Sequence, residues 1–380
     1  MLGHKRIPSR EGGVEVVVEE LSKRMVGLGH DVVCYNRRGH HVIDVRFDKR
    51  NLSEYQGIRL KRVMTFDLKG LAAMTASFFA SLSIAFGEYD VAHYHAEGSC
   101  IMMWIPKLLG KRCVVTIHGL DHKRAKWGRF ARACIMWGEK CAAKYADEII
   151  VLSKGVQQYF KDVYGRETKY IPNGVIRPDI AEADLINTEF ALEKDSYILF
   201  LGRIVPEKGL KYLIEAYKQV KTDKKLVIAG GSSDTDRFIT VLKALSRGDA
   251  RIVFTGFVQG QLLHELYSNA YIYTLPSDLE GMPLSLLEAM SYGRCCLVSD
   301  IAECADVVEE MALAFSKGNV SDLRDKLQLL CDSPEIVDKY KESAADFILR
   351  RHSWDDAVWK TLELYHNTSQ IQKTEMRSTI

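Results

Sequence analysis

Short apolar runs alternate with longer amphipathic stretches along almost the whole chain. Runs of four to six mostly apolar residues predict buried strands, and the stretches between them have the spacing of helices. The predicted strands are residues 31–35, 91–94, 112–117, 148–152, 197–201, 225–229, 251–254, 270–275 and 295–298. The predicted helices are residues 14–29, 70–86, 130–145, 209–220, 234–245, 283–292 and 320–331. This alternation predicts an α/β protein with parallel sheets.

The chain divides into two halves. Residues 176–194 lack clean periodicity, and 380 residues exceed one ordinary core, so we expect two domains joined there. The glycine loop 9–13 opens a helix, a place that normally follows a buried strand, yet only Met1 and Leu2 are left to form that strand. We therefore expect a truncated first strand.

Charge separates the two halves. The composition, 47% hydrophobic and 27% charged, is that of a soluble globular protein. Residues 1–180 hold 29 Lys and Arg against 19 Asp and Glu, whereas residues 181–380 hold 23 against 31. The basic half is expected to face an anionic partner, and nucleic acid and an anionic membrane surface both fit that sign.

The cysteines and the apolar stretches indicate where in the cell the protein is expected to lie. Nine cysteines are scattered, and the adjacent Cys295 and Cys296 suit no ordinary disulfide, which favours a reducing cytoplasm. The start of the chain lacks the apolar region of a signal peptide. The charge-free stretch 70–87 contains several Ser and Thr, so we interpret it as a buried helix and not as a membrane span.

The strongest candidate site is the segment 277–290, which follows a predicted strand. Pro283 stands where proline suits the first turn of a helix, and the free N–H groups there favour a diphosphate. Glu288 lies about 7–8 Å along that helix at 1.5 Å per residue, where a carboxylate can accept hydrogen bonds from a ribose diol. Glu280, in the preceding turn, can do the same for the transferred sugar. Two solvated glutamates beside a helix are the alternative.

A second candidate is the segment 200–209. A strand delivers Arg203 to its carboxyl end, where open α/β sheets bind ligands, and Lys208 precedes the next helix. A guanidinium and an ammonium that converge there would neutralise charge on a departing nucleotide diphosphate. The alternative is a surface loop with two solvated cations.

The first half offers His118 at a strand end, followed by Gly119, which permits close backbone approach. Asp121 is either a carboxylate that orients the acceptor or a helix cap. His93 and His95 share one strand face without a third ligand nearby in sequence, so no metal site is predicted. A Rossmann Gly-x-Gly-x-x-Gly fingerprint and a Walker loop are absent, which disfavours a dehydrogenase or an NTPase.

Residues 123–144 mix Lys and Arg with Trp127, Phe130 and Trp137. This composition fits a solvated helix over a core. It equally fits a helix that contacts anionic lipid or a lipid-diphosphate acceptor.

These motifs together resemble the retaining family-4 glycosyltransferases over almost the whole chain. The family's two glutamates eight residues apart match Glu280 and Glu288, and its Gly-Arg-x-x-x-x-Lys-Gly motif matches residues 202–209. Its Gly-Gly loop, His-Gly pair and interdomain Pro-Asn-Gly match residues 12–13, 118–119 and 172–174. Residues 9–21 and 119–127 are similar to a bacterial branch that includes rhamnosyltransferases of surface polysaccharide assembly.

The resemblance implies a GT-B fold, with two Rossmann-like doubly wound domains facing a central cleft. It implies an acceptor-binding domain over residues 1–178, a donor-binding domain over residues 179–352, and a C-terminal helix within 353–380 that packs on the first domain. The implied reaction is the retaining, metal-independent transfer of a hexose or deoxyhexose from a nucleotide-diphosphate sugar. The acceptor would be a saccharide, lipid-linked, at the inner face of the plasma membrane. Front-face attack without an enzyme nucleophile is the expected mechanism.

The resemblance also assigns roles to residues. The implied catalytic residues are Arg203, Lys208, Glu280 and His118. The implied donor-binding residues are Gly12, Gly13, Gly202, Gly281, Met282, Pro283, Leu284 and Glu288. Asp121 and Glu97 are the candidate acceptor residues, and no metal or other cofactor is expected besides the nucleotide sugar as co-substrate.

Three other functions compete. A sugar-nucleotide 2-epimerase would share the fold but not the two-glutamate pattern. A non-catalytic nucleotide-sugar-binding protein is disfavoured by the intact pair Arg203 and Lys208 and by Glu280. Only the basic first half suggests nucleic-acid binding, which we do not expect.

Overall fold

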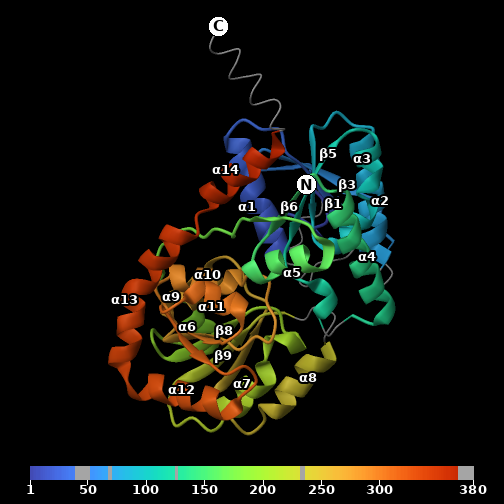
Figure 1. Ribbon diagram of the computed structural model, residues 1–380. Coiled ribbons are helices and arrows are strands. Elements are labelled where there is room, and N and C mark those ends of the chain that lie inside the picture. Colours follow the sequence, from blue (N-terminus) through green and yellow to red (C-terminus); the bar gives the residue numbers. More distant parts are fainter. Residues whose placement is uncertain (39–51, 67–70, 125–126, 232–235, 367–380) are drawn as a thin grey trace.

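The computed structural model describes residues 1–38, 52–66, 71–124, 127–231 and 236–366. Figure 1 shows two lobes, the upper one built from the first half of the chain and the lower one from the second half. The parallel-sheet α/β fold predicted from the apolar runs is therefore confirmed.

The upper lobe contains two sheets of mostly parallel strands, in the orders β1-β3-β2 and β4-β5-β6-β7. Its strands are β1 (Val33–Arg37), β2 (Glu54–Tyr55), β3 (Ile58–Val63), β4 (Val91–His95), β5 (Arg112–Ile117), β6 (Glu148–Val151) and β7 (Lys169–Tyr170). Leu2 lies between the two sheets. Its amide donates to His93 O at 3.0 Å and its carbonyl accepts from His95 N at 2.8 Å, while Tyr35 N donates to Met1 O at 3.0 Å. Met1 and Leu2 thus occupy the position of the short first strand.

The lower lobe contains one parallel sheet of six strands, in the order β10-β9-β8-β11-β12-β13. Its strands are β8 (Tyr197–Leu201), β9 (Lys225–Ala229), β10 (Ile252–Gly256), β11 (Ile272–Leu275), β12 (Cys295–Ser299) and β13 (Leu313–Phe315). The strand order reverses between β8 and β11. Doubly wound sheets bind ligands at such a switch point, beyond the carboxyl ends of the strands.

Helices cover both faces of the sheets and bury them in one core per lobe and a third beneath the C-terminal helix. The α-helices of the upper lobe are α1 (Gly13–Gly27), α2 (Leu71–Ala85), α3 (Trp104–Leu108), α4 (Arg129–Tyr145), α5 (Lys154–Tyr164) and α14 (Trp354–Tyr365). Those of the lower lobe are α6 (Leu185–Phe190), α7 (Leu210–Tyr217), α8 (Asp236–Leu245), α9 (Gln261–Asn269), α10 (Leu284–Ser291), α11 (Ala302–Val308), α12 (Val320–Asp332) and α13 (Pro334–Arg351). Short 3₁₀ helices are η2 (Glu97–Met102), η3 (Asp121–Lys123) and η4 (Pro206–Lys208).

The chain crosses between the lobes twice, and the two crossings lie side by side. Val175 forms a parallel bridge with Ser353, and Val175 N donates to His352 O at 2.8 Å. A Cβ on Gly174 would lie 2.1 Å from Trp354 N, so only glycine permits this approach. After the second crossing, α14 packs against α1, as Figure 1 shows in red and blue. The predicted return of the C-terminal helix is confirmed, although residues 367–380 lie outside the described part.

The predicted linker 176–194 is partly wrong. It contains α6, which packs on α9, and Ile186 and Leu192 are fully buried in the core of the lower lobe. Strands β2, β3, β7 and β13 were not predicted. The apolar stretch 70–86 forms α2, and in the described ranges no helix meets the length and apolarity of a membrane span.

Candidate active site

A cleft of about 280 Å³ lies between the lobes. From the upper lobe and the first crossing it is lined by Arg10, Glu11, Gly12, Gly13, Val14, Glu15, Val16, Val17, His118, Asp121, Arg124, Leu152 and Asn173. From the lower lobe it is lined by Leu201, Gly202, Arg203, Lys208, Ala229, Gly230, Gly231, Phe257, Val258, Leu263, Glu280, Gly281, Met282, Pro283, Leu284, Ser285 and Glu288. Every predicted site residue is among them except Glu97.

Lys208 and Glu280, predicted from separate motifs, form an ion pair on the floor of the cleft. The Lys208 ammonium donates to Glu280 Oε1, and Ser277 Oγ donates to the same oxygen at 2.6 Å. The two side chains are 11% and 9% exposed, so water screens this pair little. The pair fixes both charges at the switch point of the lower sheet.

Arg203 follows β8 directly and enters the same cleft. Burial lowers the pKa of its guanidinium, and the positive charge of Arg124 lowers it further. Among the described residues, the guanidinium of Arg203 has no hydrogen-bond partner. Arg203 and Arg124 are half-buried cations that influence each other, and an anionic ligand would stabilise such a position.

Glu288 lies on α10 and is held from both lobes. Tyr267 Oη donates to its Oε2 at 3.0 Å, and Arg10 Nη1 donates to its Oε1 at 3.1 Å. Burial raises the pKa of Glu288, while the charge of Arg10 acts in the opposite direction. Arg10 thus forms a hydrogen bond with the carboxylate that we predicted to bind ribose.

Two helix N-termini open into the cleft. No side chain caps α1 at Gly12 or α10 at Pro283, so backbone N–H groups remain available at both. A Cβ on Gly13 would lie 3.5 Å from Leu284 Cδ1, which shows how closely α1 faces α10. Uncapped N-termini attract phosphate groups.

The lobes come closest where Gly119 meets Gly281. A Cβ on Gly281 would lie 1.6 Å from His118 O, and a Cβ on Gly119 would lie 3.0 Å from Gly281 Cα. Any side chain on Gly281 would therefore force the lobes apart. Met282 adds a contact across the same boundary, because Asn173 N donates to its Sδ at 3.1 Å.

Three histidines lie in a row in the upper lobe, with His118 at the cleft and His95 and His93 behind it. His95 Nδ1 and His118 Nε2 share a hydrogen bond at 3.1 Å, and the rings of His93 and His95 stack with centroids 4.3 Å apart. His93 contacts Tyr365 Oη of α14 at 2.6 Å. Burial lowers the pKa of His118 to about 4 and the pKa of His95 well below its usual range. His118 is therefore neutral at neutral pH.

Asp121 lines the cleft, but Glu97 lies beneath it. Asp121 N donates to Glu97 Oε1 at 3.1 Å, so Glu97 supports the segment that carries Asp121. Burial raises the pKa of Glu97 well above its usual range, and the nearby Asp121 carboxylate raises it further. The prediction that Glu97 contacts the acceptor therefore has no support from the position of its side chain.

Sequence reasoning missed several cleft residues. Arg124 forms an ion pair with Asp121 at 2.7 Å and lines the cleft, ahead of the helix α4 that the segment 123–144 was expected to form. Glu207 does not line the cleft, but it is buried without a hydrogen-bond partner for either carboxylate oxygen and influences the pKa of both Arg124 and Arg203. Arg10 contacts Glu288 across 278 residues of sequence. Only a charge inside a glycine loop could have indicated Arg10.

Two family models match the two halves of the chain. The model described as Glycosyltransferase Family 4 matches residues 11–176, and Glycosyl transferases group 1 matches residues 183–347. An uncharacterized glycosyltransferase of Methanocaldococcus jannaschii is 24% identical, with 94% of this chain and 95% of the relative covered. The UDP-Gal:alpha-D-GlcNAc-diphosphoundecaprenol alpha-1,3-galactosyltransferase of Escherichia coli is 29% identical, with 56% of this chain and 58% of the relative covered.

A solved structure supports the fold. Anabaena HepE in complex with UDP and glucose has a TM-score of 0.78 and 16% identity, with 95% of this chain and 97% of that chain covered. The two lobes around one cleft define the GT-B fold, and the matched models make the protein a glycosyltransferase. The chain is a GT-B glycosyltransferase of the family 4 type.

Proposed function

We propose that this enzyme transfers a hexose or deoxyhexose, with retention and without a catalytic metal, from a nucleotide-diphosphate sugar to a lipid-linked saccharide. The setting would be bacterial surface polysaccharide assembly, in the rhamnosyltransferase-like branch. The supporting observation is the cationic group of Arg203 and the Lys208–Glu280 pair at the switch point of the lower sheet.

The donor fits the lower side of the cleft. Arg203, Lys208 and the N–H groups of α10 receive the diphosphate, and Glu288 accepts hydrogen bonds from the ribose once Arg10 moves away. Glu280 and the neutral His118 face the transferred sugar from opposite lobes. Two protein cations supply the charge neutralisation that a divalent ion supplies in other transferases.

The chemical step needs no enzyme nucleophile. The bond from the anomeric carbon to the phosphate oxygen breaks, and a bond to the acceptor hydroxyl oxygen forms on the same face. The hydroxyl proton moves to the departing phosphate oxygen. Arg203 and Lys208 stabilise the charge that develops on that phosphate.

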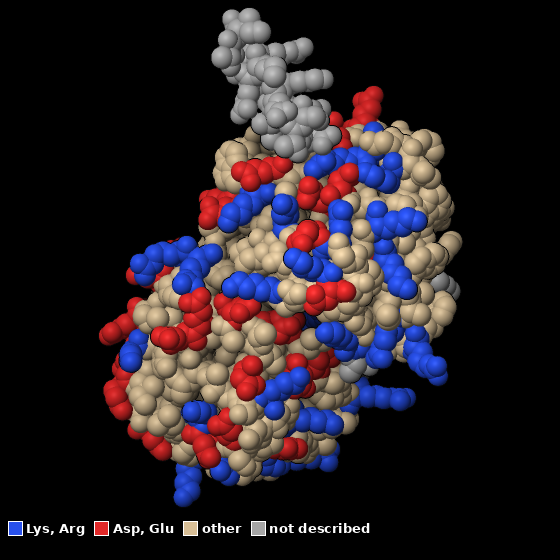
Figure 2. Space-filling view, viewed as in Figure 1, with Lys and Arg blue, Asp and Glu red and all other residues tan. Residues whose placement is uncertain are grey.

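A lipid-linked acceptor is supported by the name of the Escherichia coli relative and by the surface of α4. One face of α4 exposes Phe130 (79%) and Trp137 (58%) to solvent. The exposed cations Arg129, Arg132 and Lys140 lie on the same helix. On the side shown in Figure 2, Lys and Arg gather along the right flank of the upper lobe, where Figure 1 places α2 and α4.

The reaction is tested by a donor screen that counts released nucleotide diphosphate for UDP, dTDP and GDP sugars. NMR of the product then reports the anomeric configuration. Retention of the donor configuration supports the proposal, whereas an inverted product contradicts it. Titration with a short oligonucleotide is the control for nucleic-acid binding, and we expect none.

Membrane contact is tested by sedimentation with anionic vesicles. We expect binding at low salt and release at high salt, since each cation contributes about 1 kcal/mol near the surface. Reversal of the charge at Arg129, Arg132 and Lys140 is expected to weaken binding about a hundredfold. The matched control reverses Lys243, Lys317 and Lys339, which are exposed on the lower lobe. Equal losses in both triple variants, or no vesicle binding by the wild type, would contradict this surface.

A further inference from the structure

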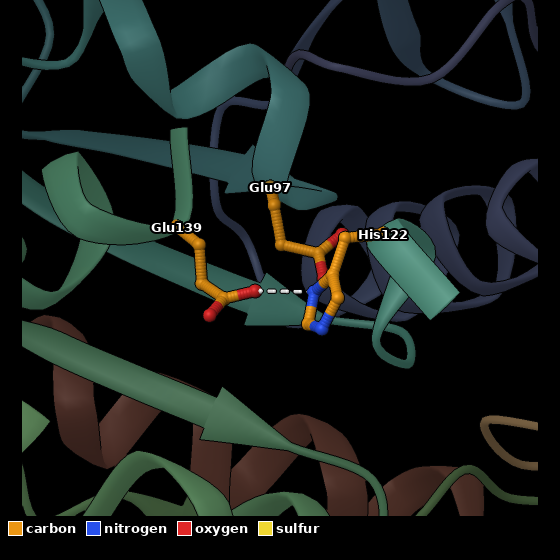
Figure 3. Close-up of side chains that lie close together, drawn as sticks. All are labelled: Glu97, His122 and Glu139. Atoms are coloured by element: carbon orange, nitrogen blue, oxygen red, sulfur yellow. Dashed lines mark hydrogen bonds and ion pairs between the residues drawn. The ribbon is translucent and has the colours of Figure 1, made fainter. Parts of the chain in front are cut away.

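Three side chains that could ligate a metal meet inside the upper lobe. Glu97 comes from η2, His122 from η3 and Glu139 from α4, and Figure 3 shows the three pointing toward one another. One ligand atom from each lies within 4.8 Å of the other two. None of the three lines the cleft, so this cluster is separate from the predicted donor site.

The two carboxylates of the cluster are almost completely shielded from solvent. Glu97 and Glu139 are fully buried, and the side chain of His122 is 13% exposed. His122 Nδ1 lies 3.0 Å from Glu139 Oε2, whereas Glu97 Oε2 is buried without a hydrogen-bond partner. A charged Oε2 would lack a donor there, and a protonated Oε2 would lack an acceptor. Neither state satisfies this atom, and buried polar atoms are rarely left so.

The surrounding bonds hold each carboxylate through its other oxygen. Tyr159 and Tyr164 donate to Glu139 Oε1 at 2.7 and 2.6 Å, and Asp121 N donates to Glu97 Oε1 at 3.1 Å. These partners orient both carboxylates from outside, as hydrogen bonds around metal sites usually do. Glu97 Oε2 has no partner, and Glu139 Oε2 and His122 Nδ1 are bonded to each other, so a cation would replace that hydrogen bond.

We propose that Glu97, His122 and Glu139 bind one divalent first-row transition-metal ion. One imidazole nitrogen with two carboxylate oxygens suits Zn²⁺, and carboxylates also suit Mn²⁺. A divalent charge would offset both buried carboxylates and give Glu97 Oε2 its partner. The ion would tie η3 to η2 and α4, and so would position Asp121 and Arg124 at the cleft without entering the chemical step.

The experiment uses the full chain after dialysis against a chelator, with Zn²⁺ and Mn²⁺ as the probes. Calorimetry is expected to show one tight site for at least one of the two ions. Because the described residues include nine free cysteines, X-ray absorption on the Zn²⁺-loaded protein must identify the ligands. Bonds at about 2.0–2.1 Å indicate nitrogen and oxygen, and bonds at about 2.3 Å indicate sulfur.

Glu97→Gln keeps the shape of the side chain and removes its charge, and we expect it to weaken binding at least about a hundredfold. Glu88→Gln, at an exposed glutamate of the same lobe, is the matched control and is expected to bind normally. If Glu97→Gln fails to fold, His122→Phe replaces it, and added Zn²⁺ is then expected to raise the Tm of the wild type but not of His122→Phe. Absence of a tight site, sulfur ligation, or an equal Tm rise in His122→Phe would overturn the proposal. All readouts are independent of sugar transfer, so failure of the proposed function would leave this test intact.

Discussion

Both lobes are built on mostly parallel sheets, but they present different chemistry at the carboxyl ends of their strands. The lower lobe places fixed charges there, the Lys208–Glu280 pair and Arg203, close to the cleft surface. The upper lobe places buried, neutral histidines there, with His118 supported by His95 and His93. In the proposed reaction, the charged diphosphate would face the lower lobe and the neutral sugar would face both, so the two lobes would divide the binding of one substrate.

Removal of a cation from the lower lobe has the largest expected effect. We expect Arg203→Ala or Lys208→Ala to lower kcat at least about a hundredfold, the scale for one preorganised charge stabiliser. Steady-state kinetics with a fixed donor and acceptor measures this. Lys211→Ala, one turn further along α7 and exposed, is the matched control. Wild-type rates in both folded site variants would refute the assigned roles.

The approach of the lobes is tested at Gly281. We expect Gly281→Ala to destabilise the closed arrangement by about 1–3 kcal/mol, because its Cβ would lie 1.6 Å from His118 O. Donor affinity and transfer rate are expected to fall about tenfold or more, at about 1.4 kcal/mol per factor of ten. Gly155→Ala is the control, since nothing lies within 4 Å of its Cβ position. Equal stability, donor affinity and transfer rate in the two variants would show that the contact at Gly281 does not contribute to function.

The neutral histidines predict how stability depends on pH. The pKa of His118 is about 4 in the folded protein and about 6.5 when unfolded, so the unfolded chain binds the proton first. Stability is expected to fall as pH drops from about 6.5 to about 4, by at most about 1.4 kcal/mol per pH unit for this group.

Urea unfolding at pH 7.5 and pH 5.5 measures this loss. His118→Gln is expected to lose less stability than the wild type over that interval, while the exposed His30→Gln is expected to match the wild type. A wild-type stability that does not change with pH would contradict the buried, neutral state of the histidines.

The smallest expected effect concerns Arg10, which joins the two lobes. Its pair with Glu288 is partly exposed, and such pairs contribute about 0–1 kcal/mol. Because the ribose of the proposed donor would replace Arg10 at Glu288, we expect Arg10→Ala to tighten nucleotide-diphosphate binding up to about fivefold in calorimetry. Arg38→Ala, outside the cleft lining, is the control. Weaker binding by Arg10→Ala would instead indicate that Arg10 contacts the phosphates.

A second difference between the two lobes explains how much of the site could be predicted from the sequence. The lower lobe holds its charges in two short contiguous motifs, so Arg203, Lys208, Glu280 and Glu288 could be located from the sequence. The upper lobe assembles its features from distant segments: Glu97, His122 and Glu139 lie 17 to 42 residues apart and share no spacing rule for metal ligands. Arg10 and Glu288 meet only because the lobes face each other.

The strands also differ in whether the sequence could predict them. Apolar runs located β8, β9 and β12, whose residues are almost all buried. Strand β3 alternates buried and exposed residues through Arg59, Lys61 and Arg62, so it lacked an apolar run. Strands β2 and β7 contain two residues each, which is too short for any periodicity. Leu2 fills its place in the upper sheet through hydrogen bonds that involve only its backbone.

The return of α14 to the upper lobe has a consequence for synthesis. Trp354 and Val358 are buried against α1, so the core beneath α1 contains residues from both ends of the described chain. While the ribosome makes the lower lobe, this core stays incomplete, and apolar side chains such as Val17 and Met25 lack their cover. The lower lobe, whose core is continuous in sequence from the first crossing to α13, can fold first. Helix α14, which is made after the lower lobe, then completes a core that the upper lobe began.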